Sequence, residues 1–311
     1  MENILQIENV TKRYKKFALE NVSITLPKGC IMGFIGENGS GKSTTIKLVM
    51  DLIHKDSGSI MVMGCDHTRM DKNIREHIGV VLDECHFPDE MNIKNVSATM
   101  KLFYRTWDSD RFMSFAKKYA IPMDRKVKEM SRGMRMKLAI AVAMSHGTRL
   151  LILDEATSGL DPVVRDEILE LLMDFIQDEE HSVFISSHIL SDLEKICDYI
   201  TFIHEGRVIL SENKDKLLEQ HGILKCGEEE FKNIRREAVI GVHRYAFGVE
   251  ALVRMDKMPF GRDDASVGNV GCPGGGTGTN GGYGQKEKSF QLEPASLEQI
   301  MLYYTKNAVK A

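Results

Sequence analysis

The stretch GENGSGKST, residues 36 to 44, decides the fold class of this 311-residue chain. It satisfies the pattern GxxxxGK[ST]; the apolar run CIMGFI precedes it, and KSTTIKLVMDLI follows it with helical spacing. Glycines let the backbone turn so that successive N–H groups point at phosphate oxygens, and the following helix adds its dipole. The order strand, glycine loop, helix therefore predicts a nucleotide-phosphate site in an α/β protein.

The residues of this loop are expected to have distinct roles. Lys42 reaches the β- and γ-phosphate oxygens in such loops, and the hydroxyl of Ser43 ligates Mg²⁺. The remaining candidates for nucleotide binding are Gly36, Asn38, Gly39, Ser40, Gly41 and Thr44. The loop indicates nucleotide binding but does not indicate what the nucleotide is used for.

The composition is that of an ordinary globular protein, with 42% hydrophobic residues, 28% charged residues and a formal net charge of −4. This acidic balance gives no electrostatic reason to expect a nucleic-acid partner. No apolar run approaches the length of about 20 residues that a membrane-spanning helix needs, and the N-terminus lacks the pattern of a secretory signal. Six cysteines without CxxC spacing are typical of a reduced environment, so we expect a cytoplasmic protein.

LLILDE, residues 150 to 155, reads as an apolar strand that ends in two carboxylates. Asp154 can hold Mg²⁺ through water, and Glu155 can polarise an attacking water molecule. Two acids at a strand end, taken alone, are more often a helix N-cap or a solvated corner. Their pairing with the glycine loop favours the catalytic interpretation.

Residues from about 88 to 145 differ from the strands around them in the spacing of their hydrophobic residues. Three segments in this range have helical spacing, and no convincing strand separates them. We therefore expect a helical subdomain inserted between strands. YITFIHEGRVILS, residues 199 to 211, reads as a hairpin that turns at Glu205 and Gly206.

The sequence pattern changes again after about residue 215. FKNIRREAV is predicted as a helix, HRYAFGVEALVR as a strand and ASLEQIMLYYTK as an amphipathic helix. Between them, the Gly-rich segment 268–284 is on composition a flexible loop or disordered linker. We therefore expect a nucleotide-binding unit over residues 1–214 and a small α+β unit over residues 215–311.

Over roughly residues 4 to 214, the sequence resembles the ATP-binding subunits of ABC transporters. Besides the two motifs above, the residues that carry the resemblance are MSRGM (130 to 134), SGLD (158 to 161), His188 in ISSH, and Tyr14. The resemblance implies a P-loop NTPase cassette, with a mixed core sheet, antiparallel N-terminal strands and the inserted helical subdomain. It also implies that Tyr14 stacks on adenine and that His188 contacts the γ-phosphate and the attacking water.

The resemblance further implies a head-to-tail dimer with two ATP molecules between the subunits. Ser131 and Gly133, with Met134 beside them, would cap the γ-phosphate of the ATP held by the second cassette. Asp161 would lie at the contact between the two cassettes. The second cassette is either an identical or a different chain.

Two of these residues and one motif have plainer interpretations. Tyr14 could be an edge-strand aromatic, because aromatic residues are common in strands. His188, at the end of an apolar strand, could be a structural histidine. SGLDP could be only a turn into a helix that begins with proline.

The chain departs from the family pattern at two places. The signature is usually written LSGGQ, and here Met130, Arg132 and Met134 replace its leucine, first glycine and glutamine. Where the family usually has a glutamine after the strand IGVV, this chain has Asp83, followed by Glu84. Asp83 is therefore a candidate Mg²⁺ ligand beside Ser43 and Asp154, and its charge is expected to slow or gate hydrolysis.

The function implied is an ATPase subunit of an ABC transporter, most similar to bacterial exporters of the ABC-2 class. The implied cofactors are ATP and Mg²⁺, and the implied partners are a second cassette and an integral-membrane permease, without nucleic acid. The chain would then lie on the inner face of the cell membrane through the permease. Two alternatives stay open: a soluble ABC ATPase with a non-membrane partner, and a regulatory nucleotide-binding module that hydrolyses ATP slowly.

Overall fold

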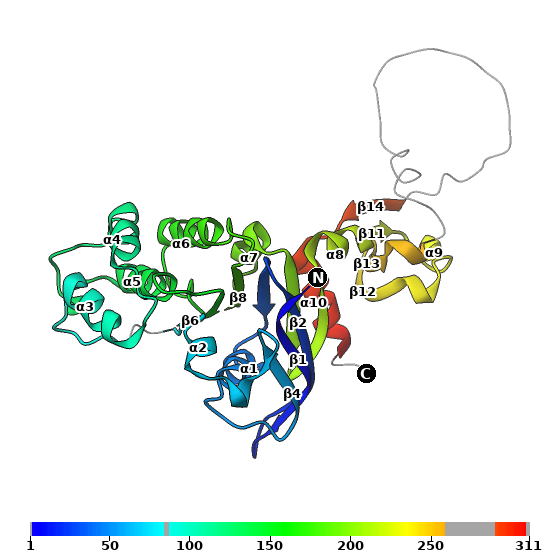
Figure 1. Ribbon diagram of the computed structural model, residues 1–311. Coiled ribbons are helices and arrows are strands. Elements are labelled where there is room, and N and C mark those ends of the chain that lie inside the picture. The colour runs from blue at the N-terminus through cyan, green and yellow to red at the C-terminus, as the bar shows by residue number, and fades with distance from the viewer. Residues whose placement is uncertain (1, 84–86, 259–289, 309–311) are drawn as a thin grey trace, which may run out of the picture. The chain divides into compact units, whose positions relative to one another are not determined.

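A computed structural model describes residues 2–83, 87–258 and 290–308 of the chain. The chain divides into two compact units, Met1–Lys214 and Asp215–Ala311, which are labelled by element in Figure 1. The Gly-rich segment 268–284 and Glu84 lie outside the described residues. No helix in the described ranges is long and apolar enough to cross a bilayer.

A six-stranded sheet forms the centre of the first unit. Its strands follow the spatial order β10-β9-β3-β8-β7-β6. Their bounds are β3 (Ile31–Ile35), β6 (Ile78–Val81), β7 (Leu150–Asp154), β8 (Ser182–Ser187), β9 (Tyr199–His204) and β10 (Arg207–Asn213). All neighbours pair in parallel except β9 and β10, which form the antiparallel hairpin predicted at Glu205 and Gly206. Every residue of β3, β7 and β8 is buried, as continuous apolar runs predict for parallel strands.

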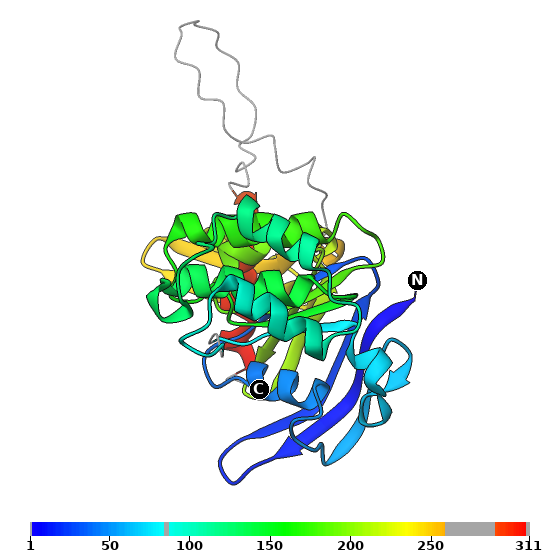
Figure 2. The same cartoon turned by 60° about the vertical axis from the view of Figure 1, so that its left-hand side comes forward.

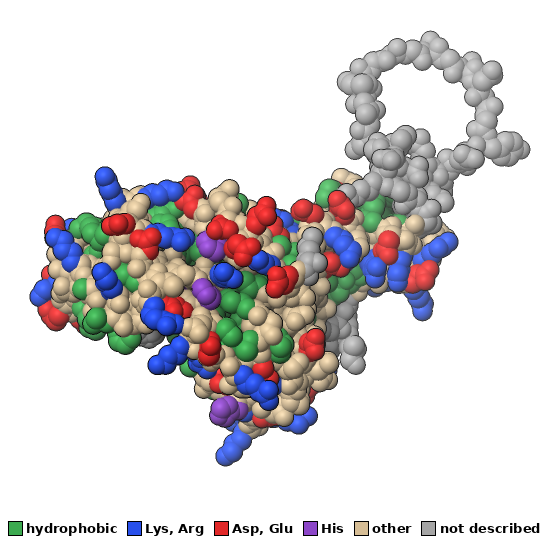
Figure 3. All heavy atoms as spheres, viewed as in Figure 1, with side chains coloured by type: hydrophobic (Ala, Val, Ile, Leu, Met, Phe, Trp, Pro, Cys, Tyr) green, Lys and Arg blue, Asp and Glu red, His purple; other side chains and the backbone are tan. Residues whose placement is uncertain are grey.

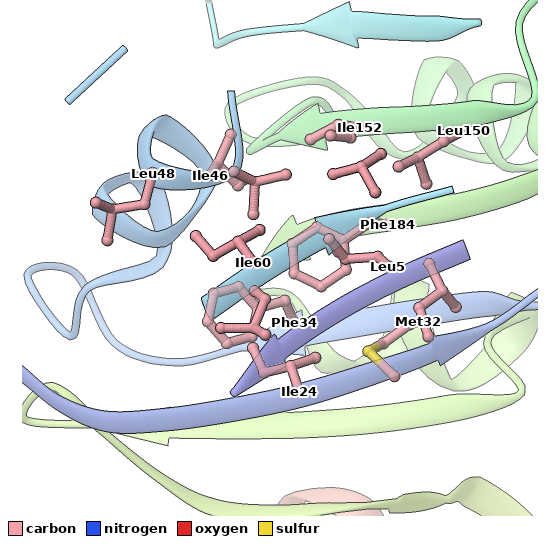
Figure 4. Packing of buried hydrophobic residues seen from close by; sticks show 14 of the residues in the cluster. Leu5, Ile24, Met32, Phe34, Ile46, Leu48, Ile60, Leu150, Ile152 and Phe184 are labelled. Atoms are coloured by element: carbon pink, nitrogen blue, oxygen red, sulfur yellow. The ribbon is translucent and has the colours of Figure 1, made fainter. Parts of the chain in front are cut away.

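A second, antiparallel sheet has the order β2-β1-β4-β5. Its strands are β1 (Asn3–Arg13), β2 (Ala18–Pro27), β4 (Ser57–Val62) and β5 (Cys65–Asp66). The apolar faces of both sheets and one side of α1 (Lys42–Val49) meet in one hydrophobic core. Figure 4 shows Leu5, Ile24 and Ile46 gathered around Phe34 and Phe184, whose ring centroids are 5.3 Å apart.

The predicted helical subdomain consists of α3 (Ile93–Phe103), α4 (Ser109–Lys118) and α5 (Arg132–Met144). Among the described residues from 88 to 145, only an isolated bridge between Asn92 and Lys126 has β pairing. These three helices lie together in Figures 1 and 2. The remaining helices of the unit are α2 (Lys72–Arg75), α6 (Pro162–Phe175) and α7 (Leu190–Ile196).

The second unit is built on a four-stranded antiparallel sheet of order β12-β13-β11-β14. The strands are β11 (His221–Cys226), β12 (Val239–Tyr245), β13 (Gly248–Arg254) and β14 (Phe290–Pro294), and the helices are α9 (Glu228–Phe231) and α10 (Leu297–Ala308), with α8 (Lys214–Gln220) at the boundary. Leu224, Ala251 and Val253 form the centre of its own small apolar core. This unit is therefore α+β, with a core distinct from that of the first unit.

Two sequence predictions in this unit are wrong. HRYAFGVEALVR is not one strand, because Tyr245 pairs with Gly248 across a tight turn that separates β12 from β13. The turn residues Ala246 and Phe247 are not the usual hairpin signals, so the run reads as continuous. FKNIRREAV is not one helix: α9 ends at Phe231, and a 3-10 turn, Arg236–Ala238, leads into β12.

Candidate nucleotide-binding and catalytic site

The glycine loop connects the end of β3 to the start of α1, as predicted. Gly39 and Gly41 have φ angles of +84° and +115°, a region that favours glycine. A Cβ atom on Gly36 would lie 2.4 Å from the Ser40 Oγ and 2.5 Å from the carbonyl oxygen of Ile203. The loop can therefore take this path only with glycines at these positions.

Lys42 is the first residue of α1, directly after the glycine loop, and only 5% of its surface is exposed. Its Nζ donates to the carbonyl oxygens of Gly36 at 2.7 Å and Glu37 at 3.2 Å. It also lies 3.0 Å from the Oε1 of Glu155, in an ion pair without an aligned hydrogen bond. The ammonium group of Lys42 therefore lies beside Glu155, the acidic residue that follows β7.

Asp154 ends β7, and Glu155 is the next residue in the chain. Asp154 is only 7% exposed, and its Oδ1 accepts a hydrogen bond of 2.6 Å from the Ser186 hydroxyl on β8. Glu155 has a φ of +53°, and this left-handed conformation costs a residue with a side chain on the order of 1–3 kcal/mol. The surrounding contacts must hold the backbone of Glu155 in place.

His188 follows β8 and lies against the same glutamate. Its Nδ1 is 2.7 Å from the Oε2 of Glu155, and 41% of its side chain is exposed. The two carboxylate oxygens of Glu155 thus contact different residues, Lys42 and His188. The structure brings all three predicted catalytic residues together, and His188 is not a buried structural histidine.

The polar groups around the loop fit a nucleotide and a divalent cation. The buried Oγ of Ser40 has no hydrogen-bond partner among the described residues. Ser43 is exposed in the first turn of α1, next to the loop. No cluster of three or more His, Cys, Asp and Glu that could hold a metal occurs in the described part of the chain. Mg²⁺ sites that use few carboxylates together with substrate phosphates match this donor set.

Asp83 lies two residues beyond the end of β6 and is exposed. Within the described ranges, no hydrogen bond or ion pair joins it to Lys42, Asp154 or Glu155. The structure therefore leaves it accessible, without a direct contact to the three residues around the loop.

Tyr14 follows the end of β1 and is 48% exposed. Its N–H donates to the carbonyl oxygen of Phe17 at 2.7 Å, and the Lys12 ammonium lies 5.6 Å from its ring centroid. The ring of Phe17 packs against the phosphate loop, since its Cζ is 3.0 Å from where a Cβ on Gly41 would lie. Tyr14 thus lies in the turn after β1 rather than within a strand, and no sequence pattern indicated that Phe17 packs against the loop.

The signature segment forms the start of α5. Ser131 is exposed and caps the helix, its Oγ accepting from the N–H of Met134 at 3.2 Å. Gly133 is buried, and a Cβ there would lie 2.7 Å from a methyl carbon of Val164 on α6. Glycine at 133 therefore lets α5 and α6 approach each other.

Asp161 caps α6, its Oδ1 accepting from the N–H of Val164 at 3.1 Å, and Pro162 is the first helical residue. The turn into a helix, one of the two interpretations of SGLDP, is thus present, and Asp161 is also exposed. Within the described residues, no hydrogen bond or ion pair joins Ser131 or Asp161 to Lys42. Both residues lie on the surface, where another molecule can reach them.

Comparison with known proteins gives a consistent result. Residues 19–158 match the family model described as ABC transporter. The chain is 36% identical over 223 residues to the lantibiotic transport ATP-binding protein SrtF of Streptococcus pyogenes, covering 68% of this chain and 92% of the relative. It is 29% identical over 274 residues to the bacitracin transport ATP-binding protein BcrA of Bacillus licheniformis, covering 82% of this chain and 85% of the relative.

A solved structure is similar in fold. The protein cbiO1 of Clostridium perfringens, described as part of the ABC transporter complex cbiONQ, superposes with a TM-score of 0.61 at 26% identity. The match covers 70% of this chain and 91% of that one.

Proposed function

This chain belongs to the ABC transporter family as an ATP-binding subunit of the exporter type, and we propose that it drives a separate permease chain. Members of this family bind and hydrolyse ATP, so the chain is an ATPase. In the proposed cycle, two cassettes close on two ATP molecules, and hydrolysis reopens them. Closing and opening would move the permease between its two access states.

The contact of Glu155 with both Lys42 and His188 carries the catalytic part of the proposal. Glu155 would accept the proton of the attacking water, and His188 would orient its carboxylate. Lys42 would leave Glu155 for the β- and γ-phosphate oxygens when nucleotide enters the loop. Nucleotide binding would thereby release the glutamate for its role with water.

We assign the divalent cation to Ser43 and Asp154, with Asp83 as the candidate third ligand. Mg²⁺ bound with ATP supplies positive charge that neutralises the phosphate oxygens. Asp83 would bring a negative charge towards the γ-phosphate and slow the reaction. ATPase rate and Mg²⁺ dependence of Asp83→Ala and Asp83→Gln test this role, and it is excluded if neither quantity changes in either variant.

We propose a homodimer, because both halves of the site are present in one chain. The phosphate loop would hold ATP from one side, and Ser131, Gly133 and Met134 of the second copy would cover it. Asp161 would then lie at the contact between the copies. Light scattering with ATP and a Glu155→Gln variant tests this: a dimer with ATP and a monomer without it supports the proposal, and a monomer in both conditions points to a different partner cassette.

A hollow of about 770 Å³ is the proposed docking site for the permease. It is lined by Asp71 to Glu76, except Ile74, and by Phe103 to Arg105, so both α2 and the end of α3 contribute. Leu102 and Phe103 are 85% and 75% exposed beside it, and Figure 3 shows hydrophobic side chains among charged ones at this end of the unit. An apolar helix end with a polar flank would match this surface.

Charge substitution tests this docking site. Phe103→Asp is expected to abolish co-purification of the permease and leave the ATPase rate of the isolated chain unchanged. Leu52→Asp is the matched control, because Leu52 is also exposed, at 63%, but lies after α1. Equal retention of the permease by both variants would reject the site.

Affinity purification of the chain from detergent-solubilised membranes of its host tests the proposed function as a whole. A stoichiometric integral-membrane protein with several transmembrane helices would support the permease partner and a place on the inner face of the membrane. Ribosomal proteins, DNA or no partner would instead support the soluble ATPase, with catalysis retained and transport rejected.

The names of the relatives suggest the class of cargo. Those names refer to lantibiotic and bacitracin transport, so we propose a peptide antibiotic as the exported molecule. Deletion of the gene in its host should lower the tolerated concentration of such peptides, and complementation with Glu155→Gln should not restore it. Unchanged tolerance to both peptide classes would reject this cargo.

We propose that residues 215–311 form an accessory domain. The unit has its own apolar core around Leu224 and Ala251, as the first unit has around Phe34 and Phe184. A chain that ends at Asn213 should therefore fold and bind ATP, as measured by thermal melting with and without nucleotide. Loss of cooperative melting would show that the cassette depends on the second unit.

A further inference from the structure

The hydroxyl of Ser186 contacts both acidic residues at the end of β7. Ser186 is fully buried on β8, and the parallel register places it beside Asp154. Its Oγ donates to the Oδ1 of Asp154 at 2.6 Å and accepts from the N–H of Glu155 at 3.1 Å. The backbone carbonyl of Ser186 accepts from the same N–H, also at 3.1 Å.

These contacts are mutually consistent. A serine hydroxyl has one proton, and an ionised carboxylate can only accept, so the proton of Ser186 is directed to Asp154. The lone pairs of the same oxygen are then available to the N–H of Glu155. One side chain therefore fixes the carboxylate of one acid and the backbone of the next.

Both contacts bear on the geometry of the reaction. With Oδ1 of Asp154 turned to Ser186, a cation would meet the other carboxylate oxygen. Glu155 keeps a left-handed backbone with φ +53°, and that conformation accompanies the contacts of its side chain with Lys42 and His188. Loss of the Ser186 hydroxyl would therefore leave both the carboxylate of Asp154 and the backbone of Glu155 less firmly held.

We propose that Ser186 is a positioning residue for ATP hydrolysis, which orients Asp154 towards the cation and holds Glu155 in its left-handed conformation. The proposal deepens the proposed function and rests on it. Ser186 touches neither nucleotide nor water in this scheme, and it acts through the two acids.

Ser182 offers a matched control at the other end of the same strand. It is also fully buried, and its Oγ also accepts a hydrogen bond from a backbone amide, that of Gly29, at 3.0 Å. Removal of either hydroxyl takes one hydrogen bond from a part-buried N–H, and the Glu155 N–H keeps the carbonyl of Ser186 as an acceptor, so the structural cost of Ser186→Ala at this amide should not exceed that of Ser182→Ala. Only Ser186 contacts the acids.

The experiment compares Ser186→Ala, Ser182→Ala and the unmodified full-length chain. The kcat of Ser186→Ala is expected to fall about 10- to 100-fold, as for other residues that orient metal ligands, with the KM for ATP within about two-fold. A second readout requires no turnover: binding of Mn²⁺ in the presence of a non-hydrolysable ATP analogue, followed by the electron paramagnetic resonance of free Mn²⁺. Its affinity should fall about 10-fold in Ser186→Ala and stay unchanged in Ser182→Ala.

Two results would overturn the inference: kcat and Mn²⁺ affinity of Ser186→Ala within two-fold of the unmodified chain, or equal losses in both alanine variants. If Ser186→Ala does not melt cooperatively, Ser186→Cys replaces it, because a thiol fills the site but donates weakly. Cysteine should lower the same two quantities, and undiminished values would again reject the proposal. An unmodified chain without ATPase activity would instead contradict the proposed function itself.

Discussion

The Nζ of Lys42 lies 3.0 Å from the Oε1 of Glu155, so the cation of the phosphate loop and the acid after β7 are paired with each other. Both side chains are largely buried, at 5% and 16% exposure. A buried charge without a partner is costly, so each residue stabilises the other in this arrangement. The phosphates of an incoming nucleotide would replace the glutamate as the partner of the lysine.

Glu155→Gln tests this exchange. We expect kcat to fall at least about 100-fold, because the proposed acceptor of the water proton is lost. The affinity for ATP should be retained or increased, because Lys42 no longer has a carboxylate to leave. Steady-state ATPase assays and equilibrium titration with a fluorescent ATP analogue measure the two quantities.

Glu170→Gln on α6 provides the control for this prediction, because Glu170 is an exposed glutamate. Neither quantity should change in it. An active Glu155→Gln variant would show that another group accepts the proton.

Tyr14→Ala tests adenine stacking. A lost aromatic stack is worth about 1 kcal/mol, so the dissociation constant for ATP should rise about five-fold. Tyr14→Phe keeps the ring and should bind as the unmodified chain does. If alanine and phenylalanine variants bind equally well, the ring does not contact adenine, and Phe17 beside the loop becomes the next residue to substitute.

Gly133→Ala tests whether Gly133 is needed for the packing of α5 on α6 or for contact with the ATP of a second cassette. The added methyl group would meet Val164 at 2.7 Å, so the free energy of unfolding should fall by about 1–3 kcal/mol. The double variant with Val164→Ala should recover much of this loss, which chemical denaturation measures.

ATPase activity of that double variant then gives the role of the signature segment. A folded double variant with low activity supports a contact between Gly133 and the ATP of the second cassette. Full activity would mean that Gly133 is needed only for the packing of α5 on α6.

His146 makes stability depend on pH. Burial lowers the pKa of His146 from 6.5 to about 4. The unfolded chain therefore binds more protons between these values, so stability is full above about pH 6.5 and falls as the pH drops towards 4. We expect a loss of about 2 kcal/mol between pH 7 and pH 5 from this residue, measured by urea unfolding at both pH values.

His146→Gln retains a donor for the carbonyl of Glu76, to which the ring nitrogen of His146 is bound at 2.8 Å. It should reduce the pH dependence, whereas His54→Gln should not, because the side chain of His54 is 90% exposed. If stability depends on pH equally in the unmodified chain, His146→Gln and His54→Gln, then a group other than His146 causes the acid sensitivity.

Motifs with a local physical cause could be predicted from the sequence. The glycine loop needs left-handed and crowded positions at Gly36, Gly39 and Gly41, and only certain residues satisfy them. The helical subdomain and the hairpin at Gly206 were likewise predictable, because periodicity and turn chemistry act over a few neighbouring residues.

Contacts between distant strands could not be predicted in this way. Ser186 lies beside Asp154 only because β7 and β8 pair in the register that places these two residues opposite each other. No local sequence pattern near either residue predicts that register. The sheet of the second unit presents the same difficulty, since β11 pairs with β14 across a long separation in sequence. The Ala246–Phe247 turn lacked a recognisable turn residue, so that hairpin was missed for a local reason.

The place of β3 between β8 and β9 has a consequence for synthesis of the chain. The ribosome makes the phosphate loop early, but the two strands that flank β3 end only at Ser187 and His204. Until those strands have emerged, the loop has no completed sheet behind it, and Lys42 has no Glu155 to pair with until β7 has joined. A growing chain that stalls before His204 would therefore expose apolar strands without a completed sheet, and such exposed strands make a chain prone to aggregation.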